Sequence, residues 1–340
     1  MFDLNQNIPF LLSVVFMLGG LAALSWSANL FIDSAAVLAR AFGVSPLIVG
    51  MVVIGFGTSA PELVVSVLSG IGNHSNLSLG NAYGSCVFNI AAILGVAALI
   101  RPLSVKPTVT FLAVPMLLLI SLLSLYLVHD GMFDRTNGIV LLVLFVLAMP
   151  LYCWFDQKTS SPAGETSAAA DADPVRKAAG RGRSALGLLL GLVLLAVSSH
   201  VLVWGCVDFA RDVLHVSDLM IGLTVVAMGT SLPELASAVA AARKGEHEFV
   251  IGNIVGSNLF NSLGVVGIAG TLSPFSGFSH YIVSRDLPVI IVLTAMIALF
   301  GFNCRRPREA GTVSRFEGCV WVFAFIVYLG VMIAQETGHL

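Results

Sequence analysis

Residues 57–63 read Gly-Thr-Ser-Ala-Pro-Glu-Leu, and residues 229–235 read Gly-Thr-Ser-Leu-Pro-Glu-Leu. The two stretches differ at one position and lie 172 residues apart. At the same offset, residues 80–89 (GNAYGSCVFN) align with residues 252–261 (GNIVGSNLFN), with six identities in ten. Because one offset serves both blocks without a gap, the sequence predicts an internal duplication.

The composition around these motifs is that of a membrane protein. Apolar residues make up 57% of the chain, charged residues make up 11%, and the mean hydropathy is +0.95. A spanning helix needs about 20 apolar residues to cross the hydrocarbon core. Ten segments meet that requirement, at residues 8–32, 46–72, 80–100, 108–128, 136–155, 185–209, 218–242, 249–272, 286–303 and 316–334.

These segments divide the chain into two halves of five spans. Residues 1–155 form the first repeat, with motifs at 55–63 and 80–89, and residues 185–340 form the second, with motifs at 227–235 and 252–261. Residues 156–184 are rich in Ala, Ser, Gly and charge, which predicts a flexible solvated linker. Because each repeat has an odd number of spans, the second enters the membrane from the opposite side. The predicted fold is an all-α integral membrane protein of ten transmembrane helices in two inverted repeats.

The orientation follows from the basic residues. With the N-terminus outside, 14 of the 17 Lys and Arg residues fall in cytoplasmic loops, five of them in the linker. The positive-inside rule therefore predicts both termini outside and the linker in the cytoplasm. The net charge of −2 argues against a nucleic-acid partner. We expect a lipid bilayer as surroundings, no cofactor and no obligate protein partner.

Residues 57–63 and 229–235 each contain one acidic residue, at a depth where the membrane is least tolerant of charge. Glu62 and Glu234 lie near the middle of their spans, where a charge costs about 2.5–3.5 kcal/mol. Pro61 and Pro233 precede them, and proline removes a backbone donor and weakens the preceding helical turn. We therefore expect both helices to break at the bilayer midplane, just before each glutamate.

A broken helix at this depth must line a cavity, where the freed carbonyl groups can be satisfied. We expect carbonyl oxygens near Gly55 and Ala227 to face such a cavity. Hydroxyl and amide oxygens accompany the two carboxylates in both copies, and Ca²⁺ prefers six to eight oxygen ligands of these kinds. The predicted cation site comprises Glu62, Glu234, Thr58, Ser59, Thr230, Ser231, Ser85, Asn89, Ser257, Asn261, Gly55 and Ala227.

The pair of motifs resembles the α-repeats of the calcium/cation antiporter superfamily, and the likeness is greatest to prokaryotic sodium/calcium exchangers. The resemblance covers essentially the whole chain. It implies that Glu62 and Glu234 are central Ca²⁺ ligands shared with Na⁺ sites, that the hydroxyl groups and Asn89 and Asn261 complete the site, and that the first and sixth spans slide as a gate. It also implies a multi-pass protein of the prokaryotic cytoplasmic (inner) membrane.

Two residues depart from the pattern. Many exchangers carry Asp where this chain has Asn261, so the site has one fewer titratable group. Cys86 stands where the second copy has Asn258. Outside the predicted ligand set, Asn81 and Asn253 follow glycines, and we expect them to cap helices rather than to bind ions.

The expected function is secondary antiport of Ca²⁺ against Na⁺ by alternating access. Proton-coupled Ca²⁺ antiport is the alternative, although proton/calcium exchangers of the superfamily tend to carry Gly-Asn-x-x-Glu in place of Gly-Thr-Ser-x-Pro-Glu. A cation channel is disfavoured by inverted repeats within one chain. An enzyme is disfavoured because the sequence has no hydrolase constellation.

Overall fold

The computed structural model describes residues 10–71, 75–159, 174–212, 227–302 and 309–336. Almost all of its regular structure is helical, and several helices contain π-helical stretches, labelled η. The first half contains α1 (Phe10–Phe42), α2 (Pro46–Val49), η1 (Gly50–Gly55), α3 (Phe56–Thr58), α4 (Ala60–Ile71), α5 (Ser75–Val87), η2 (Phe88–Leu94), α6 (Gly95–Ile100), β1 (Leu103–Val105), η3 (Val109–Ala113), α7 (Val114–Val128), β2 (Met132–Phe133) and α8 (Arg135–Thr159). The second half contains α9 (Pro174–Asp212), α11 (Ala227–Gly229), α12 (Leu232–Lys244), α13 (His247–Leu259), η5 (Phe260–Val265), α14 (Val266–Leu272), β3 (Phe275–Ser276), η6 (Ile282–Asp286), α15 (Leu287–Gly301), β4 (Gly311–Val313) and α16 (Arg315–Glu336).

Eight helices in the described residues are long and apolar enough to cross a bilayer, and one bent pair, Pro46–Thr58 with Ala60–Leu68, makes a ninth candidate. Nine of the ten predicted spans are thus present as apolar helices. The other prediction, 218–242, begins outside the described residues. The first helix continues to Phe42, beyond its predicted end at residue 32.

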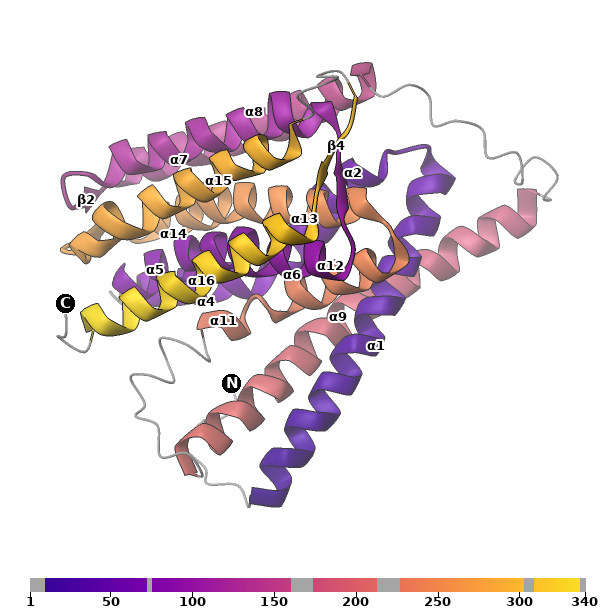
Figure 1. Ribbon diagram of the computed structural model, residues 1–340, viewed down its shortest axis with the longest axis horizontal. Coiled ribbons are helices and arrows are strands. Elements are labelled where there is room, and N and C mark those ends of the chain that lie inside the picture. Colours follow the sequence, from indigo (N-terminus) through magenta and orange to yellow (C-terminus); the bar gives the residue numbers. More distant parts are fainter. Residues whose placement is uncertain (1–9, 72–74, 160–173, 213–226, 303–308, 337–340) are drawn as a thin grey trace.

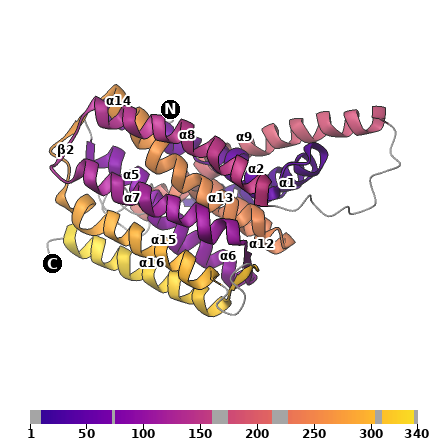
Figure 2. The ribbon, with the colours of Figure 1, turned by 90° about the horizontal axis from the view of Figure 1, so that it is seen from above.

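Most of these helices form one bundle, in which α7, α8, α14, α15 and α16 run side by side (Figures 1 and 2). The helix α14 packs on α8, α15 packs on α7, and α16 packs on α6. Two long helices, α1 and α9, pack along each other and lean away from this bundle. The pair contacts the bundle mainly through α12, which begins within residues 229–235 and carries Glu234 in its first turn.

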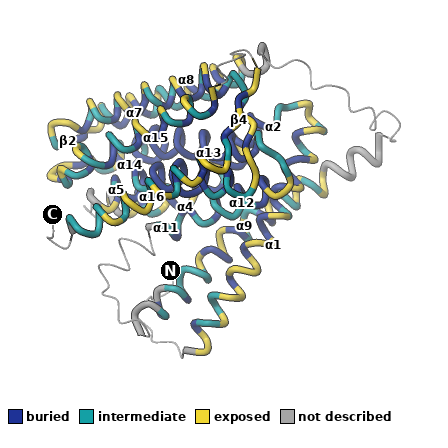
Figure 3. The backbone as a smooth tube through the Cα atoms, in the orientation of Figure 1, coloured by how far each residue is buried: buried dark blue, intermediate teal, exposed yellow. Residues whose placement is uncertain are grey.

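The helices that carry residues 80–89 and 252–261 are more buried than the outer helices of the bundle (Figure 3). In an apolar stretch of 18 residues within Leu77–Ile100, 78% of the residues are buried, and in such a stretch within His247–Leu272 all of them are. In the corresponding stretches of Arg135–Phe155 and Arg315–Gln335 only 17% of the residues are buried, and large apolar side chains cover their outer faces. Apolar surface of this extent marks contact with lipid, so the polar motifs lie inside a membrane-embedded bundle.

Two short antiparallel ribbons tie the halves of the chain together. In one, β1 pairs with β4, and Leu103 lies opposite Val313. In the other, β2 pairs with β3, and Phe133 lies opposite Phe275. Each ribbon takes one strand from each half, and they lie at opposite ends of the bundle (Figure 1).

The linker prediction needs correction at both ends. Residues 156–159 continue α8, and residues 174–184 form the beginning of α9. Pro174 begins α9, a position where the missing N–H of proline has no helical partner to lose. Composition indicated a linker because small and charged residues bury little apolar surface, but Ala, Lys and Arg are also strong helix formers.

Next to the motifs, the backbones of α13 and η1 lie very close together. A Cβ atom on Gly256 would fall on the carbonyl oxygen of Met51 and 2.7 Å from the Cα atom of Met51. A Cβ atom on Gly55 would lie 2.8 Å from the backbone nitrogen of Ser257. Glycine is therefore required for the two copies of the motif to meet at this distance.

Candidate ion-binding site

The helix that contains residues 57–63 is interrupted at a serine, and so is the helix that contains residues 229–235. Ser59 separates α3 from α4 with φ −85° and ψ 8°, and Ser231 precedes α12 with φ −93° and ψ 11°. Both conformations lie in the sparsely populated bridge region, where many active-site residues are found. In the first copy the helix axis bends by 41° at this point. The predicted breaks are therefore present, and they come three residues before each glutamate.

The break places each carboxylate in the first turn of a new helix. Glu62 lies in the first turn of α4, and Glu234 lies in the first turn of α12. The unpaired N–H groups of a helix N-terminus favour negative charge. Pro61 and Pro233 fit because proline is tolerated in a first turn, where it removes no helical hydrogen bond.

The two copies exchange hydrogen bonds through their serines. Ser59 Oγ donates to Glu234 Oε1 over 2.7 Å, and Ser231 Oγ donates to Glu62 Oε1, also over 2.7 Å. Ser85 Oγ lies 3.0 Å from Ser231 Oγ. Each glutamate is thus held by the broken helix of the other copy, and all five side chains are at most 2% exposed.

Several polar atoms at this point have no protein partner among the described residues. They are the second carboxylate oxygen, Oε2, of Glu62 and Glu234 and both amide atoms of Asn89 and Asn261. These four side chains are at most 1% exposed. Unpaired buried polar groups are costly, so their oxygens are available to a cation or to ordered water. Both asparagines lie in π-helical segments, η2 and η5, and such segments are frequent at functional sites.

The two threonines are less available than predicted. Thr58 Oγ1 donates to the carbonyl oxygen of Ile54, one turn back in its own helix, over 2.9 Å. Thr230 Oγ1 donates to Asn81 Oδ1 over 3.3 Å. Each hydroxyl oxygen still has lone pairs for a cation. The threonines thus lie beside the site with their protons already engaged.

The predicted carbonyl ligands also need correction in one copy. The carbonyl oxygen of Gly55 accepts the backbone N–H of Ser59 over 3.2 Å and Ser257 Oγ over 3.3 Å. The helix remains continuous through Gly55, so its break does not free this carbonyl group. Ala227 begins α11 in the second copy.

Cys86, the departure in the first copy, does not touch the glutamates through any described contact. Its Sγ atom lies 3.9 Å from the carbonyl oxygen of Asn258 and 3.5 Å from Ser262 Oγ. Asn258 donates to the carbonyl oxygen of Ile254 in its own helix. The described contacts of Cys86 and Asn258 are therefore separate from the hydrogen bonds between the site serines and glutamates.

The structure corrects the capping role predicted for Asn81 and Asn253. The helices α5 and α13 begin at Ser75 and His247, so both asparagines lie inside helices. Each binds the backbone of a site glutamate: Asn81 Nδ2 donates to the carbonyl oxygen of Glu62, and Asn253 Nδ2 donates to that of Glu234. Their recurrence at the common offset was the sequence signal for this role.

The arrangement as a whole is an oxygen cage with two carboxylates. In the described residues, no group of three or more His, Cys, Asp or Glu side chains is placed to hold a metal ion. Neutral oxygens with two carboxylates suit hard cations such as Ca²⁺, which needs no nitrogen or sulfur ligand. Because both charges lie at the junction of the two motif copies, a cation there would contact both halves of the chain.

Ser59→Ala and Ser231→Ala test the cross-copy bonds. Each removes one hydrogen bond to a carboxylate, and such bonds contribute about 1.5–3 kcal/mol. We expect each variant to weaken apparent Ca²⁺ affinity by roughly tenfold to a hundredfold, measured as the Ca²⁺ concentration for half-maximal thermal stabilisation. Ser121→Ala is the matched control, because buried Ser121 bonds only its own helix in α7. Unchanged affinity in both site variants would show that the serines do not organise the carboxylates.

The chain is similar to known proteins over almost its whole length. The model of a family described as sodium/calcium exchanger protein matches residues 12–154 and 183–334. The chain is 33% identical to the inner membrane protein YrbG of Escherichia coli over 95% of its own length and 97% of that protein. It is 27% identical to the sodium/calcium exchanger MaX1 of Methanosarcina acetivorans over 93% of its own length and 97% of that protein. Its structure matches the sodium–calcium exchanger NCX_Mj, soaked with Na⁺ and Sr²⁺, with TM-score 0.79 and 27% identity, covering 95% of this chain and 99% of that one.

Proposed function

The chain belongs to the sodium/calcium exchanger protein family, and from this premise we propose that it is a secondary antiporter that moves Ca²⁺ across the membrane in exchange for Na⁺. One observation carries the proposal. The glutamates of the two motif copies face each other through reciprocal serine bonds, and each keeps one buried oxygen unpaired.

Charge and ligand number favour Ca²⁺ as one substrate. Two ionised glutamates neutralise one divalent cation, so the bound ion leaves no net charge at the membrane centre, where uncompensated charge is costly. The free oxygens of Glu62, Glu234, Asn89 and Asn261 supply part of the coordination shell. Hydroxyl oxygens or water can complete the six to eight ligands that Ca²⁺ prefers.

Na⁺ is the proposed counter-ion because it can use the same oxygens in smaller groups. A monovalent ion requires one carboxylate rather than two, so Na⁺ ions can share the site that one Ca²⁺ fills. Exchange follows if both cations compete for the same glutamates. Two similar proteins, MaX1 and NCX_Mj, are described as sodium/calcium exchangers, which supports Na⁺ as the ion exchanged for Ca²⁺.

Alternating access would follow from ten spans in two inverted repeats. In support, the π-helical segments η2 and η5 begin 172 residues apart, at the offset of the motifs. The two interstrand ribbons, which each join both halves, lie at opposite ends of the bundle, as inversion requires. The proposed moving element is the α1–α9 pair, which leans away from the bundle (Figure 1).

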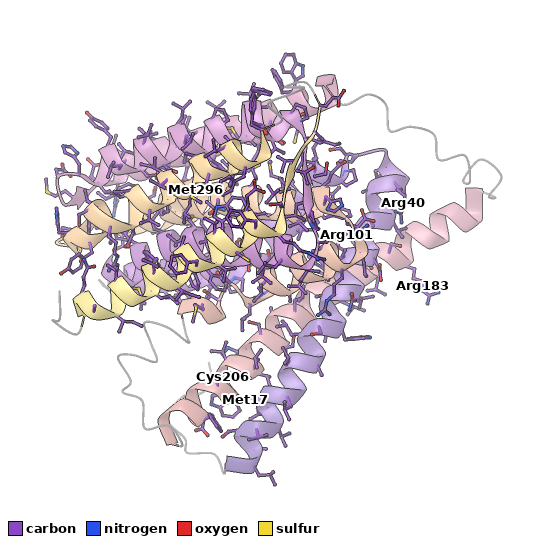
Figure 4. All side chains as sticks on the ribbon, viewed as in Figure 1. Met17, Arg40, Arg101, Arg183, Cys206 and Met296 are labelled. Atoms are coloured by element: carbon purple, nitrogen blue, oxygen red, sulfur yellow. The ribbon has the colours of Figure 1, made fainter. Side chains whose placement is uncertain are left out.

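The proposed membrane is the cytoplasmic membrane of a prokaryote, as for the inner membrane protein of Escherichia coli that the chain resembles. Basic side chains support the orientation with the linker in the cytoplasm. Arg40, Arg101 and Arg183 lie toward the same end of the molecule, whereas Met17 and Cys206 lie near the other end of the α1–α9 pair (Figure 4).

Flux into proteoliposomes tests the proposed function. Vesicles that contain the purified protein are loaded with Na⁺ and diluted into Na⁺-free medium with radiolabelled Ca²⁺. We expect Ca²⁺ uptake that requires the outward Na⁺ gradient. Uptake driven only by a proton gradient would contradict Na⁺ coupling and identify proton-coupled antiport. Uptake that needs no opposing ion would contradict antiport and identify a channel.

Asn261→Asp probes the position where many exchangers carry Asp. The substitution keeps the side-chain size and adds a third carboxyl group to the site. Protons then compete with cations for one more group, so we expect exchange to fall more steeply as the pH is lowered. The measurement is the initial rate of Na⁺-driven Ca²⁺ uptake against pH. Asn137→Asp, at the start of α8, is the control, and coincident profiles for wild type and Asn261→Asp would place Asn261 outside the site.

A further inference from the structure

Two buried asparagines next to the ion site are not themselves among its proposed ligands. Asn81 in α5 is 5% exposed, and Asn253 in α13 is 2% exposed. Asn81 Nδ2 donates to the carbonyl oxygen of Glu62 over 3.0 Å, and Asn253 Nδ2 donates to that of Glu234 over 3.2 Å. Each amide therefore fixes the backbone from which a site carboxylate extends.

The amide oxygen of each asparagine binds the opposite copy of the motif. Asn81 Oδ1 accepts a hydrogen bond from Thr230 Oγ1 over 3.3 Å. Asn253 Oδ1 lies 3.4 Å from Thr58 Oγ1, whose single proton it shares with the closer carbonyl oxygen of Ile54 at 2.9 Å. Each threonine directly precedes the serine at which its helix breaks. One amide thus connects a glutamate in one half of the chain to the broken helix of the other half.

The orientation of both amides is determined by their partners. A backbone carbonyl oxygen only accepts hydrogen bonds, so the asparagine must present its NH₂ group to the glutamate. Its oxygen then faces the threonine, whose hydroxyl can donate. Aspartate in this place would set an acceptor against the carbonyl oxygen, and alanine would remove both bonds. Asparagine makes the connection in both directions, whereas aspartate and alanine do not.

We propose that Asn81 and Asn253 are positioning residues of the exchange reaction, which couple the glutamate of each motif copy to the broken helix of the other. The inference rests on the proposed function, because it assumes that the glutamates bind the transported cations. A cation that moves either glutamate acts through the amide on the threonine of the opposite copy. The two halves of the site therefore respond to an ion together.

One further bond distinguishes the two copies and provides a control. Asn81 Nδ2 also lies 2.9 Å from Ser66 Oγ, whereas Ala238 occupies the corresponding position in the second copy. Ser66 Oγ also donates to the carbonyl oxygen of Ser78, and Ser78 Oγ donates to the carbonyl oxygen of Ser66. Ser66→Ala removes both contacts of the Ser66 hydroxyl group and leaves the link from Glu62 to Thr230 intact. A purely structural role for Asn81 would make the two substitutions equivalent.

The test is a pair of double-mutant cycles read as apparent Ca²⁺ affinity, from the Ca²⁺-dependent rise in melting temperature of the purified protein. The first cycle combines Asn81→Ala with Thr230→Val, which are in contact. The control cycle combines Asn81→Ala with Thr58→Val, which bonds Asn253 instead. We expect each single variant of the first cycle to lose about threefold to tenfold in affinity, and the double variant to lose little more. We expect the control cycle to be closer to additive, because no described hydrogen bond joins Asn81 to Thr58.

Asn81→Asp and Ser66→Ala provide a second test, which can be made even if Asn81→Ala does not fold. Asn81→Asp retains the volume of the side chain and loses the bond to Glu62, and we expect a similar loss of affinity, while Ser66→Ala retains wild-type affinity. Additive effects in both cycles, or equal losses from Asn81→Asp and Ser66→Ala, would overturn the inference. A wild type that binds Ca²⁺ but does not exchange it for Na⁺ would refute the proposed function while leaving the cycles measurable. A wild type that binds no Ca²⁺ would overturn both.

Discussion

Glu62→Gln and Glu234→Gln are each expected to abolish Na⁺-driven Ca²⁺ uptake while the protein remains folded. The substitution keeps the size of the side chain and its ability to accept the serine bond, but removes one of the two charges that face the cation. Removing one partner of a buried charge interaction costs about 2–5 kcal/mol, so Ca²⁺ affinity should fall by roughly thirtyfold or more. Uptake and Ca²⁺-dependent thermal stabilisation measure the two effects separately.

The matched control is Glu248→Gln near the start of α13. Glu248 pairs with Lys106 over 2.8 Å, and both side chains are partly exposed. Exposed ion pairs contribute about 0–1 kcal/mol, so this variant should transport like the wild type. Retained transport in both Glu62→Gln and Glu234→Gln would refute the assignment of the site.

Gly256→Ala is expected to eliminate transport through the backbone rather than through charge. The new Cβ atom would overlap the carbonyl oxygen of Met51, which belongs to η1 and cannot rotate away as a side chain can. Overpacking of this kind costs about 1–3 kcal/mol or more. Relief requires α13 and η1 to separate, and η1 leads directly into the broken helix at Ser59. We expect a lower melting temperature together with lost Ca²⁺ stabilisation.

Gly330→Ala in α16 is the control for this substitution. No described atom lies within 4 Å of a Cβ atom at that position, and alanine favours helix more than glycine does. The control should be as stable as the wild type and should transport normally. Normal transport by Gly256→Ala would contradict the close approach of the two motif copies.

The sequence predicted the parts of the structure that depend on local chemistry. Long apolar runs identified nine spans that the structure contains as helices, because a helix is the spanning form that satisfies its own backbone. Pro61 and Pro233 indicated the helix breaks, although the breaks fall at Ser59 and at Thr230–Ser231 rather than directly before the glutamates. The duplicated motif selected both carboxylates, which the structure places in one buried site.

The remaining features depend on packing between distant segments. Ser59 and Glu234 are 175 residues apart, and no local pattern states that each serine binds the glutamate of the other copy. The connecting role of Asn81 was missed because Gly-Asn is also a frequent beginning of a helix. The helical ends of the linker were missed because polar composition was taken to indicate a flexible chain.

Anomalous X-ray scattering from crystals soaked with Sr²⁺ would test most directly whether a transported divalent cation binds between the two motif copies. We predict one strong peak between the carboxylates of Glu62 and Glu234, at ligand distances close to the 2.3–2.6 Å of Ca²⁺, which disappears when excess Na⁺ is added. A peak elsewhere in the bundle, or none between two intact carboxylates, would contradict the proposed exchange site.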